Sequence, residues 1–171
     1  MAAWTDVREA ILEELATLMT GLSGVGSVWR NRGQLEESEG EGLPAIIVLD
    51  GREENTMEVP AQKTVIFPAV IMAMRPEIVV QLKPRDTVQN LLLDGQVDPP
   101  GPELSSWRQR IMQAIFNDQV IVGNPTSRVY GLLGSGGQIN YVGCETDMRI
   151  GSPMVGQMMM GFEFRYTLLP P

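Results

Sequence analysis

One stretch near the C-terminal end constrains the fold more than any other. Over residues 157–169, apolar and polar side chains alternate strictly. One face would carry Met158, Met160, Phe162, Phe164, Tyr166 and Leu168, and the other Gln157, Met159, Glu163, Arg165 and Thr167. A period of two indicates a β-strand with one buried face. The chain must therefore form a sheet, and another layer must cover the apolar face of that sheet.

Further strand patterns supply partners for this strand. Residues 138–150 are joined to it by the turn 151–156, which predicts an antiparallel hairpin. Residues 25–30 predict a short strand. Residues 44–49 form a run of β-formers closed by Asp50-Gly51, which is typical of a buried central strand that stops at a turn.

The stretch 62–83 is rich in β-branched and apolar residues but contains two prolines. Pro68 lacks a backbone donor, so it belongs at a bulge or on an edge. Arg75-Pro76 would end one strand. Residues 77–82 then form either a second strand or a helix with Pro76 in its first turn, where proline is tolerated.

Two helices are predicted from apolar residues at helical spacing. The first spans residues 4–22 and is capped by Thr5 or Asp6; the second is capped by Ser105 or Ser106 and runs to about Asn117. We expect a long connection over 84–103, a small strand at 128–133 and a turn at 134–137. Residues 1–171 therefore predict one α+β domain, with a central, mostly antiparallel or mixed sheet packed against two main helices and extended loops.

The residue types from which active sites are usually built are scarce. The chain has no histidine, so the commonest general base and metal ligand is missing. Its single cysteine, Cys144, cannot form an internal disulfide, and we interpret it as a small strand residue. No phosphate-binding P-loop motif occurs, and the acids at 36–41 lack the spacing of a calcium loop. We predict no enzymatic activity and no cofactor or metal, although a pair of carboxylates acting as acid and base stays a remote alternative.

Charge is distributed unevenly along the chain. Its net charge is −8, which argues against a DNA-binding surface. Residues 34–58 hold eight acids against Arg52 alone, a net of −7. With one cysteine and no signal-peptide pattern, we expect a protein of the reducing cytoplasm, and no apolar run is long enough to cross a membrane.

The order of these elements resembles that of the tail terminator proteins of long-tailed bacteriophages, also called minor tail or tail-completion proteins. The likeness spans nearly the whole chain, and four pieces carry it: Arg30-Asn31-Arg32-Gly33 and residues 43–51, 141–147 and 151–166. The resemblance implies a virion protein, assembled in the host cytoplasm, that forms a hexameric ring on the tail tube at its head-proximal end. Such a ring stops tube growth and presents its other face to head-completion or connector proteins. Genomic DNA passes through its channel without specific binding.

Several residues are candidates for contacts with neighbouring subunits, with the tube or neck, or for the ring lumen. They are Arg30, Arg32, Glu36, Glu37, Glu39, Glu41, Arg52, Glu53, Glu54 and Met159. An acidic lumen would repel DNA phosphates. Arg30 and Arg32 could pair with acids of a neighbouring subunit or be ordinary surface arginines. Met159 is a candidate contact residue because it lies on the face of the strand opposite the apolar one. The nearest alternative is that the chain is another virion joining protein, such as a head-tail adaptor or a tail tube subunit.

Overall fold

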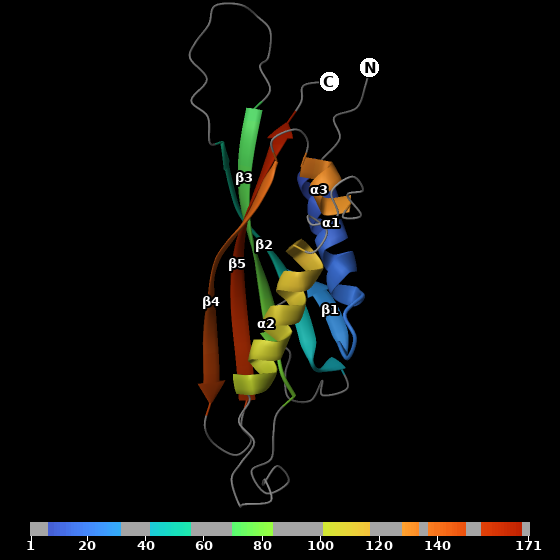
Figure 1. The fold of residues 1–171 in the computed structure, drawn as a ribbon, viewed down its shortest axis with the longest axis vertical. Helices are drawn as coiled ribbons and strands as arrows, with labels where there is room; N and C mark the ends of the chain where they lie inside the picture. Colours follow the sequence, from blue (N-terminus) through green and yellow to red (C-terminus); the bar gives the residue numbers. More distant parts are fainter. Residues whose placement is uncertain are drawn as a thin grey trace, which may run out of the picture.

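The fold is α+β, with a twisted mixed sheet and helices along one side of it (Figure 1). The computed structural model describes residues 7–31, 42–55, 70–83, 101–116, 128–133, 137–149 and 155–168. In chain order, its elements are α1 (Val7–Thr20), β1 (Ser27–Arg30), β2 (Ala45–Asn55), β3 (Val70–Gln81), α2 (Gly101–Phe116), α3 (Arg128–Leu133), β4 (Gln138–Arg149) and β5 (Val155–Leu168). The predicted fold class, with two main helices on a mixed sheet, is confirmed.

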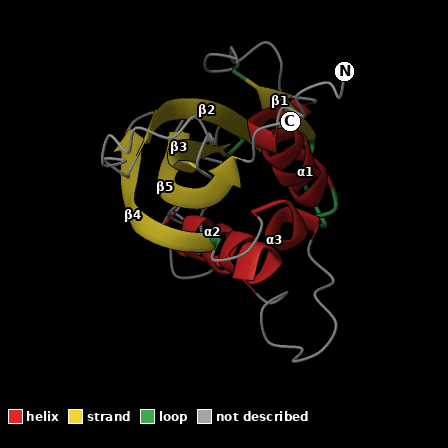
Figure 2. Cartoon of the chain, turned by 90° about the horizontal axis from the view of Figure 1, so that it is seen from above, coloured by secondary structure: helices red, strands yellow, loops and turns green. Residues whose placement is uncertain are grey.

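Within the described residues, five strands form one sheet in the order β1-β2-β3-β5-β4. β1 runs parallel to β2, and the other neighbours are antiparallel. β4 and β5 form the predicted hairpin, and β4 is left as a 12-residue edge strand. Seen from above, the sheet is strongly curved, and the helices lie on one side of it (Figure 2).

The core lies between the sheet and the helices. The alternation predicted for the last strand is confirmed, because Met158, Met160, Phe162, Phe164 and Tyr166 are all at most 2% exposed. They meet Ile11, Leu12, Leu15 and Met19 of α1 and Leu104, Trp107, Ile111 and Ile115 of α2. Each large apolar side chain buried in this way contributes roughly 1.5–3 kcal/mol to folding.

β2 and β3 both run past the points where breakers were expected to end them. Leu49 pairs with Glu77 and Arg52 with Arg75, so Asp50 and Gly51 together oppose Pro76 in a β-bulge. The bulge tolerates Pro76, because a ladder donor is not needed there. It also uses Gly51, whose φ of 67° suits glycine. The prediction of a turn at 50–51 is therefore wrong. Residues 77–81 are strand, so the helical alternative for this segment is excluded.

Two predictions about the helices need correction. α2 begins at Gly101, ahead of the expected caps at Ser105 or Ser106, because Pro102 falls in the first turn where its missing donor costs nothing. Residues 128–133 are helix rather than strand. Val129 and Leu133, four residues apart, are both buried in the core, so helical packing outweighs the β-propensity of the segment.

Candidate interaction surface

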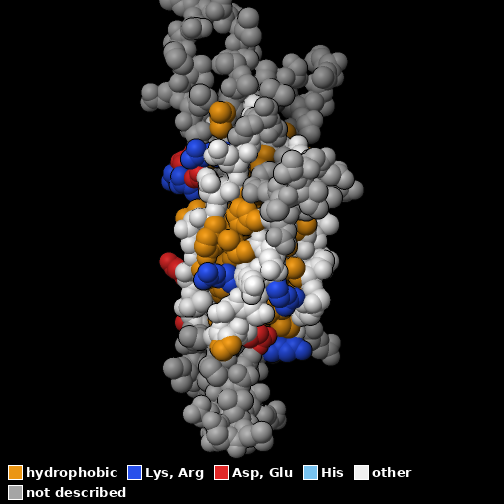
Figure 3. Space-filling view, in the orientation of Figure 1, with side chains coloured by type: hydrophobic (Ala, Val, Ile, Leu, Met, Phe, Trp, Pro, Cys, Tyr) orange, Lys and Arg blue, Asp and Glu red, His pale blue; other side chains and the backbone are white. Residues whose placement is uncertain are grey.

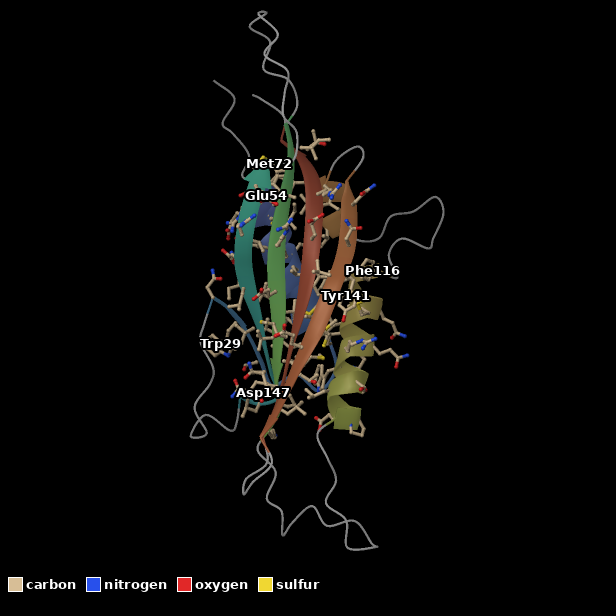
Figure 4. All side chains as sticks on the ribbon, turned by 90° about the vertical axis from the view of Figure 1, so that its left-hand side faces the viewer. Trp29, Glu54, Met72, Phe116, Tyr141 and Asp147 are labelled. Atoms are coloured by element: carbon tan, nitrogen blue, oxygen red, sulfur yellow. The ribbon has the colours of Figure 1, made fainter. Side chains whose placement is uncertain are left out.

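The two broad faces of the molecule differ in construction. The side drawn in Figure 3 is built from the helices and shows basic side chains over α2 beside an apolar patch. The other face is the outer surface of the sheet, which Figure 4, turned by 90° from Figure 3, shows with the strands in front of α1. Among the described elements, no helix packs on this side. We call it the open face.

A row of apolar side chains crosses the open face. Trp29, Ile47, Val79 and Met159 are in register across β1, β2, β3 and β5. Ile47 and Val79 are buried, Met159 is half-buried, and Trp29 is 41% exposed. The row ends at β4, where Glu145 pairs with Met159. Within this row, Trp29 and Met159 are therefore the side chains that offer apolar surface, and an acid lies at the β4 edge.

A hollow of about 340 Å³ interrupts the open face beside this row. It lies where Gly143 of β4 pairs with Gly161 of β5, so two neighbouring positions lack a side chain. A Cβ added at Gly143 would meet nothing within 4 Å. A register shift between Tyr141 and Gly143 leaves Val142 66% exposed at the rim. The lining consists of Glu77, Val142, Gly143, Cys144, Glu145, Met159 and Gly161.

Beyond the hollow, the open face carries a charged ladder of Arg52, Glu54, Arg75, Glu163 and Arg165. Arg75 Nη2 lies 2.9 Å from Glu54 Oε1, and Arg75 Nε donates to Glu163 Oε2 at 3.2 Å. Arg165 Nε donates to Glu163 Oε1 at 2.9 Å. The bond from Arg165, joined by that from Arg75, outweighs partial burial and holds the pKa of Glu163 below its usual value. Opposite signs alternate here, so each charge on this part of the surface finds a partner.

The helix side holds a second group of charges, the arginine cluster, which joins α1 to β1 and β2. Arg30 Nη2 donates to both carboxylate oxygens of Asp50, at 2.9 and 3.0 Å, and to Glu9 Oε2 at 3.2 Å. Arg8 Nε lies 3.2 Å from Glu53 Oε2, and the Tyr166 hydroxyl donates to the other oxygen of Glu53. The charge-assisted hydrogen bond from Arg30 to Glu9 and the ion pair between Arg8 and Glu53 tie the N-terminal helix to the sheet.

The arginine cluster shifts the pKa values of its members. Hydrogen bonds to Glu9 and then to Asp50 raise the pKa of Arg30, against the effect of burial. Burial raises the pKa of Asp50, but hydrogen bonds from Asn31 and Arg30 and the charges of Arg30 and Arg8 outweigh it. The pKa of Asp50 is therefore lowered, and its carboxylate is ionised at neutral pH.

The candidate residues predicted from sequence fall into different places. Arg30 and Glu53 belong to the arginine cluster, so Arg30 finds its acids within its own chain. Arg52 and Glu54 belong to the charged ladder, and Met159 lines the hollow. In the described part of the acidic segment, Asp50, Glu53 and Glu54 each pair with an arginine, so their charge is locally balanced. Arg32, Glu36, Glu37, Glu39 and Glu41 lie outside the described residues.

Sequence reasoning missed Glu77, Val142 and Glu145 at the hollow. A signal was present, because Gly143 and Gly161 each stand alone inside a predicted strand. Isolated strand glycines often mark a bulge or a close approach by another group. The pairing of the two glycines, which creates the hollow, needs the register of the hairpin.

Within the described ranges, no group of three or more histidine, cysteine, aspartate or glutamate residues is placed to hold a metal ion. None of the described helices is long and apolar enough to cross a membrane. Neither a scan against protein-family models nor a search of curated proteins finds a match to the chain.

Proposed function

We propose that this chain is a structural virion protein of a long-tailed bacteriophage. In this role it caps the tail tube as a hexameric ring, ends tube polymerisation and offers the joining surface for head-completion or connector proteins. The proposal combines the sequence resemblance with one structural observation. The open face carries apolar side chains, a hollow and a charged ladder, which together form a surface suited to contact with another protein.

The exposed parts of the open face are those that association would cover. Val142 is 66% exposed and Trp29 41%, although both are large apolar side chains. Both lie on edge strands of the sheet, Trp29 on β1 and Val142 on β4. A 12-residue edge strand such as β4 invites pairing with another chain unless it is covered. Subunit contacts in a ring would cover such an edge.

The overall charge suits a ring through which DNA passes. Each copy carries a net charge of −8, so six copies would repeat that charge around a channel. A field of this sign repels phosphates and would keep the genome from adhering during passage. The charge therefore supports transit of DNA rather than binding.

Tube assembly with the partner protein tests the proposal. The tail tube protein of the same virus would be polymerised with and without this chain, and the products measured by electron microscopy. We expect the chain to stop elongation and to form one ring at a single end of each tube. Tubes that grow equally long in its presence would contradict the proposal. Long open polymers of the chain alone would point instead to a tube subunit.

A further inference from the structure

The hollow on the open face has the chemistry of a socket for a basic side chain. Its lining includes the apolar residues Val142 and Met159 and the acidic residues Glu77 and Glu145. Asp147 follows Glu145 on the same face of β4 and is exposed. No ion pair within the described part of the chain engages these three acids. An arginine satisfies both features, because its aliphatic stem packs on apolar walls while its guanidinium meets carboxylates.

The helix side carries an exposed basic side chain, that of Arg108, which suits this hollow. Arg108 is exposed on α2 and, among the described residues, makes no ion pair with an acid. It lies within electrostatic range of Tyr141 on the neighbouring strand β4. Figure 4 shows Tyr141 and Phe116 on the same side of the molecule, where β4 passes α2. Both aromatic side chains are only partly buried.

The other arginine of α2 is already engaged. Arg110 lies over the Trp107 ring, 4.0 Å from its centroid, and donates to the carbonyl oxygen of Ser23. Arg108 is therefore the arginine of α2 that is available for an outside partner. It projects from a surface that also offers partly exposed aromatic area.

The geometry points to a contact between two copies of this chain, in which Arg108 of one copy enters the hollow of the next and binds Glu77 and Glu145. This inference rests on the proposed ring, for which it names the contacting surfaces. Charge complementarity selects a second copy as the occupant. The chain is acidic overall, yet it places a basic and aromatic surface on α2 and an acidic and apolar hollow on the opposite side of the sheet.

The placement of the two surfaces determines the kind of assembly. They are different surfaces, one on a helix and the other on the open face of the sheet, so each copy can use both at once, and the contact is heterologous. A heterologous contact repeats from copy to copy and closes into a ring when its rotation divides a full turn. The same contact would cover the exposed Val142.

Charge reversal in the full-length chain tests the contact. Self-association of the purified protein would be measured by analytical ultracentrifugation over a range of protein and salt concentrations. We expect Arg108→Glu and Glu145→Arg each to weaken association by at least roughly 30-fold, since like charges would then face each other. The double variant Arg108→Glu/Glu145→Arg should recover most of the wild-type affinity. Wild-type association should also weaken with added salt.

Lys83→Glu is the matched control for Arg108→Glu, because it makes the same change in charge at an exposed residue that follows β3, does not line the hollow and does not belong to α2. It should leave association unchanged. Equal weakening by the control, or a double variant as weak as the singles, would overturn the contact, and so would a wild-type chain that stays monomeric at every concentration. The tube-capping experiment is independent of this result. A chain that caps tubes but ignores charge reversal would refute the contact and retain the proposed function.

Discussion

Gly51 is the position where one added methyl group should disturb this fold most clearly. Its φ of 67° lies in the left-handed region, where an alanine costs about 1–2 kcal/mol. A Cβ at this position would stand 1.7 Å from the carbonyl oxygen of Arg75 and 2.5 Å from its carbon. Both are backbone atoms of β3, so no side-chain rotation relieves the overlap. The strand must shift, at a further cost of about 1–3 kcal/mol.

Gly51→Ala should therefore lower the free energy of unfolding by about 2–5 kcal/mol, a large share of the 5–15 kcal/mol typical of a domain. At about 2–4 °C per kcal/mol for a chain of this size, the melting temperature should fall by roughly 10 °C. Equilibrium urea unfolding followed by circular dichroism measures the change. Gly51→Asn separates the two causes, because asparagine tolerates the left-handed conformation but still carries the overlapping Cβ.

Gly131→Ala is the matched control for this experiment. Gly131 lies in α3, and a Cβ there would meet nothing within 4 Å. Replacing a helical glycine with alanine should stabilise the protein by up to about 1 kcal/mol. If Gly51→Ala unfolded within about 0.5 kcal/mol of the wild type, the close approach of β2 and β3 at the bulge would be refuted.

Three further predictions concern the core and the arginine cluster. Phe162→Ala should lower the free energy of unfolding by about 3–5 kcal/mol, because Phe162 is fully buried against the rings of Phe116, Tyr141 and Phe164. A decrease below about 1 kcal/mol in urea unfolding would contradict that packing. Asp50→Asn should cost about 1 kcal/mol at neutral pH, a modest value because the pair with Arg30 is partly solvated. The pKa of Asp50 is lower in the folded protein than in the unfolded chain, where it is near 4, so the ionised carboxylate stabilises the fold at pH values above about 4. This stabilisation should disappear as the pH falls through the lower pKa of the folded protein. On acidification, the melting temperature of Asp50→Asn should therefore fall less than that of the wild type. Equal falls in melting temperature would refute the arginine cluster as the cause of the pH dependence.

Local patterns in the sequence were enough for the elements with a clear period. The alternation in β5 predicted its buried face because successive side chains of a strand point to opposite sides, whatever it pairs with. The helical spacing in α2 likewise predicted its buried stripe, whereas in α1 it predicted Ile11 and Leu15 but missed the buried Leu12 and Met19. The same reasoning failed at residues 128–133 and at 50–51. There the outcome depends on what the segment packs against, a buried core for Val129 and Leu133 and a neighbouring proline for Gly51.

The hollow and the charge pairs depend on contacts between segments that are far apart in the sequence. The sequence by itself determined an α+β chain with a half-buried hairpin, no histidine and a strong negative charge. Only the tertiary structure brought Gly143 beside Gly161 to open the hollow, placed Arg30 between Glu9 and Asp50, and left Arg108 exposed on the opposite side of the sheet. The physical reason is distance along the chain. Periodicity reports how one segment divides between core and solvent, whereas a charge pair or a hollow depends on strand register between segments that are far apart in sequence.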